Sequence, residues 1–301
     1  MTIKKLLEQH IAKKVKPKKV ACLLSGGVDS LSLALAAHDI GKKVIAYSFH
    51  LKDNLSYDFE TARSVAEKMH WKFVPVVVPT DNLVDDWHRL VKLGCRKKTH
   101  FECVFPFLYV YPVIKEKCVL TGWGSDAYFT PSKTASMRYS SITKAKNYIR
   151  YWKDFYKIKS FSSKSDRQFK IRLTYNQYRI KYLDGDCAGL KEHTRVAEQH
   201  DKIHVTPYLD KDVRKFLLSK NYKELNRPRQ KEIIRKDFTK LEEFGKIKEH
   251  INLQLGAGVN KLFEKLLENT EINFKSRKRM MDVASDWYLE NQKTSLEKFF
   301  K

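Results

Sequence analysis

Four short apolar runs divide the first part of the chain, at residues 20–24, 43–49, 71–78 and 118–120. Each run is short and almost continuously apolar, as expected of strands that are buried on both faces. Helix-like patterns lie between and after them, at 29–37, 57–70, 81–94 and 105–117. Strands that alternate with helices in this way predict an α/β fold with a doubly wound parallel sheet of about five strands.

The sequence pattern predicts mainly helices in the second half of the chain. Residues 1–18 predict a further, basic amphipathic helix that Pro17 closes. The helices expected later are at 175–187, 190–200, 211–218, 230–240, 259–269 and 277–291. After Pro131 the chain becomes rich in Lys, Ser and Tyr. These patterns divide it into a parallel-sheet core at 1–131, a basic, aromatic-rich insertion at 132–170 and a helical region at 171–301 that completes the fold.

The first apolar run ends in Ser-Gly-Gly-Val-Asp-Ser at 25–30. Two glycines between a strand and a helix let backbone N–H groups gather at a helix N-terminus, where they bind anions. Ser25 and Ser30 add hydroxyl donors, and Asp29 is a carboxylate that can hold Mg²⁺ against phosphate oxygens. The spacing fits neither a P-loop nor a G-x-G-x-x-G loop, and a plain glycine turn is the alternative.

A second strand end carries a similar stretch, Thr-Gly-Trp-Gly-Ser-Asp at 121–126. In a parallel sheet both stretches fall at the carboxyl ends of the strands, where ligands bind. We therefore expect Asp29 and Asp126 to share one Mg²⁺ over a pyrophosphate group. A helix N-cap is the other role open to Asp126.

The composition indicates a globular chain without a membrane segment. Of its 301 residues, 42% are hydrophobic and 31% are charged. No run of about 18 apolar residues occurs, and the basic N-terminus lacks the apolar segment of a signal peptide. The five cysteines are scattered without a C-x-x-C pair, which predicts thiols in a reducing compartment and a cytoplasmic protein. For Cys95 and Cys103, sulfur transfer and plain buried thiols are both open.

The net charge of +24 is large enough to bind RNA or DNA by counterion release. In the insertion, lysines and arginines alternate with aromatic side chains that can stack on bases, although such aromatics also serve ordinary packing. The basic residues are Lys144, Lys146, Arg150, Lys153, Lys157 and Lys159, and the aromatic ones are Tyr148, Tyr151, Trp152, Phe155 and Tyr156. A shorter basic run at 96–98 can contact phosphate or form a solvated loop.

The stretch at 25–30 resembles the pyrophosphate-binding signature of the PP-loop ATP pyrophosphatases (adenine nucleotide alpha hydrolase-like enzymes), which cut ATP between the α and β phosphates. With the stretch at 121–126, the chain resembles the synthetase domain of asparagine synthetase. Three later stretches are similar to that family: Thr-Pro-Tyr-Leu-Asp at 206–210, Lys-Glu-Ile-Ile-Arg at 231–235 and Gly-Ala-Gly at 256–258. The resemblance covers about 18–130 and 175–265, and it implies a HUP-like core.

The resemblance also implies ATP and Mg²⁺ as cofactors and an AMP-forming amide ligase. A carboxylate attacks the α-phosphate, pyrophosphate leaves, and an amine then displaces AMP. A lysine stabilises the charge at the α-phosphate. Lys248 is the candidate from its distance to 256–258, with Lys231 and Lys246 also open. The expected nucleotide contacts are Ser25, Gly26, Gly27, Asp29, Ser30, Ser48, Thr121, Gly122 and Gly124, with Asp29 and Asp126 as metal ligands.

The chain departs from the family in three ways. Trp123 stands where the family has an acidic residue that acts near the substrate amine, and Ala127 replaces the acid that follows Asp126. The glutaminase domain that precedes the synthetase domain in that family has no counterpart, so a partner glutaminase or another amine donor is expected. The first of these departures, Trp123, puts aspartate in doubt as the substrate.

Three functions are therefore open. The first is an ATP-dependent ligase that forms an amide on a small carboxylate, which the stretches at 206–210 and 256–258 favour. The second is an ATP pyrophosphatase that modifies a nucleobase in tRNA or DNA through an adenylated base, which the charge and the insertion favour. The third is a nucleotide-binding protein that has lost catalysis, for which Trp123 and Ala127 are the argument.

Overall fold

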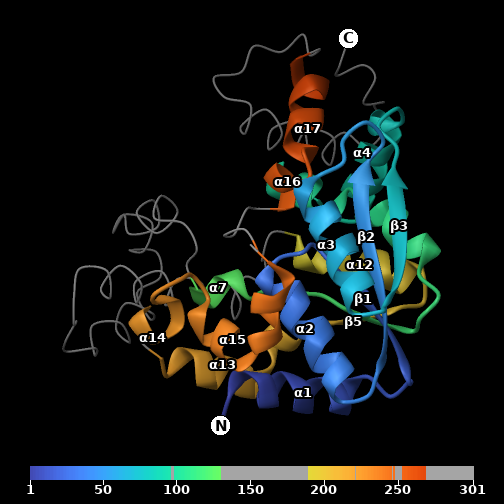
Figure 1. Ribbon diagram of the computed structural model, residues 1–301. Coiled ribbons are helices and arrows are strands. Elements are labelled where there is room, and N and C mark those ends of the chain that lie inside the picture. The colour runs from blue at the N-terminus through green and yellow to red at the C-terminus, as the bar shows by residue number, and fades with distance from the viewer. Residues whose placement is uncertain (96–97, 130–188, 221, 246, 248–252, 269–301) are drawn as a thin grey trace.

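The computed structural model describes residues 1–95, 98–129, 189–220, 222–245, 247 and 253–268 (Figure 1). Its centre is a five-stranded sheet in the order β3-β2-β1-β4-β5, with every pair of neighbours parallel. The strands are β1 (Lys19–Leu23), β2 (Lys43–Leu51), β3 (Lys72–Val78), β4 (Cys118–Leu120) and β5 (Ile203–Val205). The predicted parallel sheet is confirmed. The apolar pattern does not indicate β5, because three residues that include His204 carry too little apolar signal.

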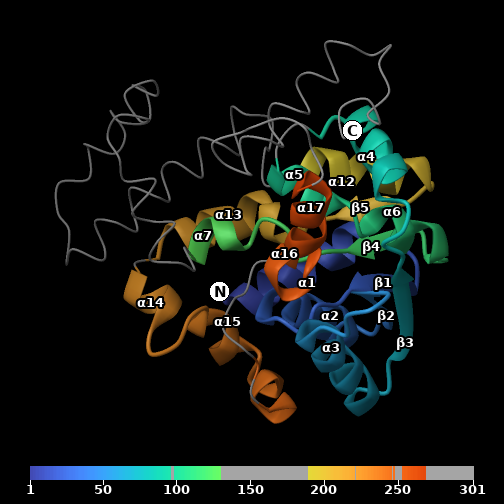
Figure 2. The same ribbon diagram turned by 90° about the horizontal axis from the view of Figure 1, so that it is seen from above.

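Helices cover both faces of this sheet (Figures 1 and 2). One face packs against α1 (Ile3–Lys14), α2 (Val28–Asp39), α3 (Tyr57–Lys68), α7 (Asp126–Phe129), α13 (Lys211–Leu218), α14 (Tyr222–Asn226) and α15 (Glu232–Asp237). The other packs against α4 (Leu83–Lys92), α5 (Lys98–Val104), α6 (Phe107–Val110), α12 (Leu190–Gln199), α16 (Leu253–Gly256) and α17 (Val259–Glu268). None of the helices in the described part of the chain is long and apolar enough to cross a membrane.

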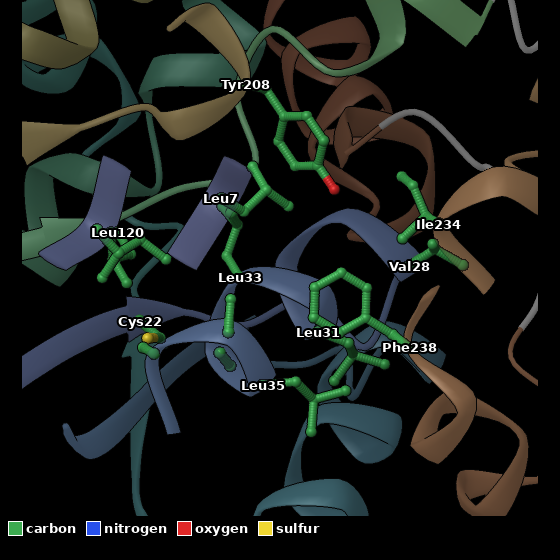
Figure 3. Close-up of a cluster of buried hydrophobic side chains, with 14 of the residues drawn as sticks. Leu7, Cys22, Val28, Leu31, Leu33, Leu35, Leu120, Tyr208, Ile234 and Phe238 are labelled. Carbon is green, nitrogen blue, oxygen red and sulfur yellow. The ribbon is translucent and has the colours of Figure 1, made fainter. Parts of the chain in front are cut away.

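Alternation along the strands divides the core between these two faces. In β1, Val20 and Cys22 belong to the cluster under α1 and α2, whereas Ala21 belongs to the cluster under α4 to α6. Because successive side chains of a strand point to opposite faces, a strand that is apolar at every position fills both clusters. Figure 3 shows part of the first cluster, where Leu31 and Leu33 of α2 lie among residues of several other elements.

The helices follow the predictions except where local chemistry interrupts them. The predicted helices at 81–94, 190–200, 211–218 and 259–269 are confirmed as α4, α12, α13 and α17. The predicted helix at 105–117 is wrong: α6 gives way to a 3-10 turn, η1 (Tyr111–Val113), which contains Pro112, a residue without an N–H to continue an α-helix. The predicted helix at 230–240 is shorter, because Lys231 is left-handed (φ 58°) and a 3-10 segment, η4 (Thr239–Phe244), follows α15.

Several sequence predictions fall outside the described residues. These are the helices at 175–187 and 277–291 and the basic insertion at 132–170. The division of the chain at 131 and 170 therefore stays a prediction.

The N-terminal helix is fixed at both ends by distant parts of the chain. Thr2 accepts a hydrogen bond from Lys5 N, and the Asp237 carboxylate accepts bonds from Ile3 N (2.7 Å) and Lys4 N (3.3 Å). At the other end, Lys42 Nζ donates to Val15 O at 2.7 Å. These contacts satisfy backbone groups that a helix terminus leaves without intrahelical partners.

Candidate active site

The first glycine loop joins β1 to α2 at the carboxyl edge of the sheet. Gly26 is left-handed (φ +68°), and a Cβ there would lie 2.6 Å from Thr61 Cβ and 3.0 Å from Asp58 O. Both the conformation and the close approach of α3 therefore require glycine. Gly27 is the N-cap of α2 and has no side chain to bond the free N–H groups of the first turn. Those N–H groups stand where the sequence predicts an anion site, and anion binding there stays a prediction.

Ser25 and Ser30 play different parts in this loop. Ser30 is buried, and its Oγ accepts a hydrogen bond from Ser25 N (3.1 Å) and donates one to Gly27 O (3.2 Å). Ser25 is exposed, and its Oγ lies 3.2 Å from Ser30 Oγ. Ser30 thus shapes the loop and Ser25 is exposed beside it, while nucleotide contacts of both serines stay predictions.

The second glycine loop follows β4 and touches the first. A Cβ on Gly122 would lie 3.0 Å from Asp29 Cβ and 3.3 Å from Ser30 N. Gly124 is left-handed (φ +88°), and a Cβ there would lie 2.4 Å from Leu209 Cδ2. The glycines of this loop therefore allow close packing on α2 and on η3 (Pro207–Leu209).

Lys231 brings the two loops together electrostatically. Its ammonium forms ion pairs with Asp29 Oδ2 and, at 2.7 Å, with Asp126 Oδ1. The side chain is only 4% exposed, and its backbone N donates to Asn226 Oδ1 at 3.1 Å. Burial alone would lower the pKa of Lys231, but the carboxylates of Asp126 and Asp29 raise it above its usual value. The ammonium is therefore charged at neutral pH.

The donor set fits Mg²⁺ brought in with a nucleotide. Asp29 Oδ1 is buried and has no hydrogen-bond partner, which leaves a carboxylate oxygen available to a cation. Within the described residues no group of three or more His, Cys, Asp and Glu side chains could hold a metal. Mg²⁺ is commonly held by one or two carboxylates together with substrate phosphates, and Asp29 and Asp126 are the residues that would supply the protein's share of such a shell.

The stretch at 206–210 contacts the second glycine loop and α2, the helix that follows the first loop. Tyr208 is fully buried, and its hydroxyl lies 2.7 Å from Ser32 Oγ. Ser32 Oγ also donates to Asp29 O at 2.9 Å. Asp210 caps α13 by accepting from Asp212 N (2.9 Å), and its second oxygen lies 2.7 Å from His10 Nδ1. The hydrogen bonds of these residues go to other parts of the protein, so they position the loops and α13.

An uncharged aromatic wall borders the second loop. The ring of Trp123 lies 6.1 Å from that of Phe107 and 4.5 Å from that of His193. Burial lowers the pKa of His193 well below its usual value and that of His204 to about 4, so both rings are neutral at pH 7. His204 is held between the hydroxyls of Thr121 (2.8 Å) and Thr194 (2.9 Å). Neither histidine stands out in the sequence, because no motif surrounds it.

The remaining predicted residues lie near this edge or outside the described residues. Ser48 is buried in β2, directly after Tyr47, whose carbonyl accepts from Leu24 N at 2.8 Å. The Gly-Ala-Gly stretch packs on the loop after β2, where Asn54 Nδ2 donates to Ala257 O at 3.3 Å. Lys246 and Lys248 lie outside the described residues.

The cysteines in the described part of the chain are buried thiols. They are Cys22, Cys95, Cys103 and Cys118. Burial, with a smaller contribution from the charge of Glu102, raises the pKa of Cys103 to about 12. A thiol with so high a pKa is a poor nucleophile at neutral pH, which favours packing over sulfur transfer.

Comparison with known proteins gives an extensive match to one family model and weak similarities to solved structures, among them a tRNA thiolase and an NMN synthetase. The family model for asparagine synthase matches residues 2–243. The U34-tRNA thiolase NcsA from Methanococcus maripaludis with its [4Fe-4S] cluster is 15% identical, with a TM-score of 0.36 over 96% of this chain and 78% of that one. NMN synthetase from Francisella tularensis is 14% identical, with a TM-score of 0.33 over 83% of this chain and 96% of that one. These TM-scores are too low to indicate a shared site. No curated protein matches the chain.

Proposed function

The chain belongs to the asparagine synthase family of ATP-using enzymes, and from that premise we propose that it is an AMP-forming ligase that activates a carboxylate and converts it into an amide. One observation carries the proposal. A buried ammonium, Lys231, lies between two carboxylates at the point where two glycine loops meet. Two loops that supply N–H donors and acidic residues beside one fixed cation suit a triphosphate with a divalent ion.

The first loop binds the phosphates. The N–H groups at the start of α2 and the hydroxyl of Ser25 donate to phosphate oxygens, and the helix N-terminus favours their negative charge. Asp29 and Asp126 would hold Mg²⁺, which when bound neutralises charge on the phosphate oxygens.

Lys231 keeps a positive charge beside the reacting phosphate. An oxygen of the substrate carboxylate attacks the α-phosphorus, and the bond from that phosphorus to the bridging oxygen breaks as pyrophosphate leaves. Negative charge on the equatorial and leaving oxygens is then stabilised by Lys231 and the loop N–H groups, which are already fixed in place. An amine next attacks the acyl carbon, and AMP leaves with the former carboxylate oxygen. Lys248 stays a second candidate for the cation at the α-phosphate.

The aromatic wall bears on the choice of substrate. Trp123, Phe107 and His193 present no charge beside the second loop. An uncharged wall gives no ion pair to an α-ammonium group, so we propose a carboxylate other than aspartate. The amine comes from a separate glutaminase or from a second substrate.

The test is an incubation with α-labelled ATP and Mg²⁺ in which AMP and ADP are separated. We expect AMP and pyrophosphate, stimulated by the right carboxylate, and a loss of about 100-fold or more for Asp29→Asn. The matched control is Asp85→Asn, which removes an exposed carboxylate of α4 and should leave turnover unchanged. ADP as the product, or ATP binding without turnover, would contradict the proposal and favour a nucleotide-binding protein.

A second function is favoured by the net charge of +24. In this alternative the adenylated group is a base oxygen in tRNA or DNA, and an amine or sulfur replaces it. The same assay separates the two functions, because AMP formation would then depend on added tRNA or DNA and not on a small carboxylate.

A further inference from the structure

The five strands all begin at the edge of the sheet that lies opposite the glycine loops. This follows from the all-parallel pairing. In Figure 1 the arrowheads of β2 and β3 point up, so their starts lie at the lower end, on the side of α1. We call the residues at these strand starts the amino edge.

Lysines stand at or just before the start of every strand. They are Lys16, Lys18 and Lys19 for β1, Lys42 and Lys43 for β2, Lys72 for β3, Lys115 and Lys117 for β4, and Lys202 for β5. The pairing brings the groups together, because Lys19 is the register partner of Lys43 and Lys43 N donates to Lys18 O at 2.8 Å. On the other side of the sheet, Ile203 N donates to Lys117 O at 2.8 Å. The amino edge therefore carries lysines at every strand start, with Lys72 set two residues further along the sheet, opposite Ile45.

Most of these lysines are exposed, and among the described residues they have no acidic partner. Of the nine, all but Lys42 and Lys202 are exposed. None of the nine makes an ion pair with a residue that the structure describes. The nearby Glu116 accepts a hydrogen bond from Tyr47 OH at 2.8 Å, and Asp39 pairs with Lys4. Lys42 differs from the others, since it binds backbone carbonyls at the end of α1.

We propose that the amino edge is a docking surface for the sugar–phosphate backbone of a nucleic acid. With strands about 4.8 Å apart, five strands spread the lysines over roughly 19 Å, the length of several phosphates of one strand. A row of flexible ammonium groups suits sequence-independent phosphate contacts. Of the large apolar side chains exposed in the described chain, Val113 and Ile203 alone flank these strand starts, too few to insert into a membrane.

This surface is separate from the candidate active site. Lys19 and Leu23 are the ends of β1, about 13 Å apart for a five-residue strand. A nucleic acid bound along the amino edge therefore leaves the glycine loops open to ATP. Binding at this edge requires neither ATP nor Asp29, whichever substrate the enzyme uses.

The experiment compares two variants of equal charge. The edge variant carries Lys18→Gln, Lys19→Gln, Lys43→Gln and Lys72→Gln. The control variant carries Lys92→Gln, Lys211→Gln, Lys215→Gln and Lys240→Gln, at exposed lysines on other elements. Binding of a labelled RNA hairpin and a labelled DNA duplex is measured by fluorescence anisotropy over a salt series, and thermal unfolding checks that both variants fold.

We expect the edge variant to lose about tenfold or more in affinity near 0.1 M salt, and the slope of log K against log salt to fall by about 3. The control variant should change both quantities much less, and Asp29→Asn should bind as the unchanged protein does. Equal losses in the two variants, or binding that needs ATP, would overturn the proposal. So would a preference for phosphatidylserine vesicles or polyglutamate over both nucleic acids, since those results would indicate a membrane or an acidic protein.

Discussion

The two edges of one sheet carry positive charge in opposite ways. At the carboxyl edge, Lys231 is 4% exposed and lies between two carboxylates. At the amino edge, Lys19 and Lys43 are exposed and have no acidic partner in the described chain. A buried, paired charge is fixed in position and insensitive to salt, whereas exposed charges are mobile and screened. The first arrangement suits chemistry on one phosphate group, and the second suits binding to many phosphate groups at once.

The residues at the two edges also differ in how strongly the fold constrains them. The carboxyl edge uses left-handed glycines, buried hydroxyls and close backbone contacts, so its residues are specified by several constraints at once. The amino edge is specified mainly by charge. Substitutions at the two edges should therefore differ in their effects on folding stability.

The largest difference should appear between Lys231→Met and Lys43→Met. Removing the buried Lys231 ammonium takes its ion-pair partner from the largely buried Asp29 carboxylate, and we expect a loss of about 3–5 kcal/mol in the free energy of unfolding. Lys43→Met should stay within about 0.5 kcal/mol of the unchanged protein. Urea unfolding measures both. A loss below about 1 kcal/mol for Lys231→Met would show that the ion pairs are not a structural element of the site.

Gly26→Ala and Gly41→Ala compare a glycine of the first loop with a glycine that has open space around it. Both glycines are left-handed, but a Cβ on Gly26 meets Thr61, whereas one on Gly41 meets nothing within 4 Å. We expect Gly41→Ala to cost about 1 kcal/mol for its conformation alone. Gly26→Ala should cost about 3 kcal/mol, because a steric clash is added. Titration calorimetry should also show weaker ATP binding for Gly26→Ala only, and equal stability losses would contradict the close contact with α3.

Acid should destabilise the fold through the histidines behind the second loop. Burial lowers the pKa of His204 to about 4, against about 6.5 in an unfolded chain, so the unfolded state binds more protons between these values. The contribution of His204 to folding stability is therefore fully present above about pH 6.5 and is lost as the pH is lowered toward 4. We expect His204 to contribute a loss of about 2 kcal/mol between pH 7 and pH 5. Urea unfolding of His204→Gln at the two pH values should show a smaller loss, and an unchanged loss would assign the effect to other groups.

The smallest effect is expected for Lys42, which differs from the other lysines of the amino edge. Lys42 donates to Val15 O and Pro17 O, so it stabilises the end of α1, whereas its neighbour Lys43 is exposed. We expect Lys42→Gln to cost about 1 kcal/mol and Lys43→Gln almost nothing. Thermal unfolding of the two variants measures the difference, and hydrogen exchange should place any loss in α1. Equal melting temperatures would show that these bonds add nothing measurable.

The sequence predicts the carboxyl edge better than most of the molecule. Strand ends marked by glycines and aspartates are expected to meet when the sheet is parallel, and the structure places Gly122 against Asp29. The choice among Lys231, Lys246 and Lys248 depends on how the chain returns to the sheet after about 200 residues, which no local pattern encodes. Pro112 is visible in the sequence, yet the apolar period around it still favours a helix. His193 and His204 take their pKa values from burial, which follows only from the fold.

One contact of the N-terminal helix bears on how the protein is made. Asp237 accepts hydrogen bonds from Ile3 N and Lys4 N, and α1 also packs against α13 and α15. Helix α1 therefore completes its native contacts only after residue 237 has been synthesised. The central strand β1 likewise pairs with β4 only after residue 120 has been synthesised. Contacts so distant in sequence slow folding, and we expect the sheet to become resistant to proteolysis late in synthesis, as a single unit.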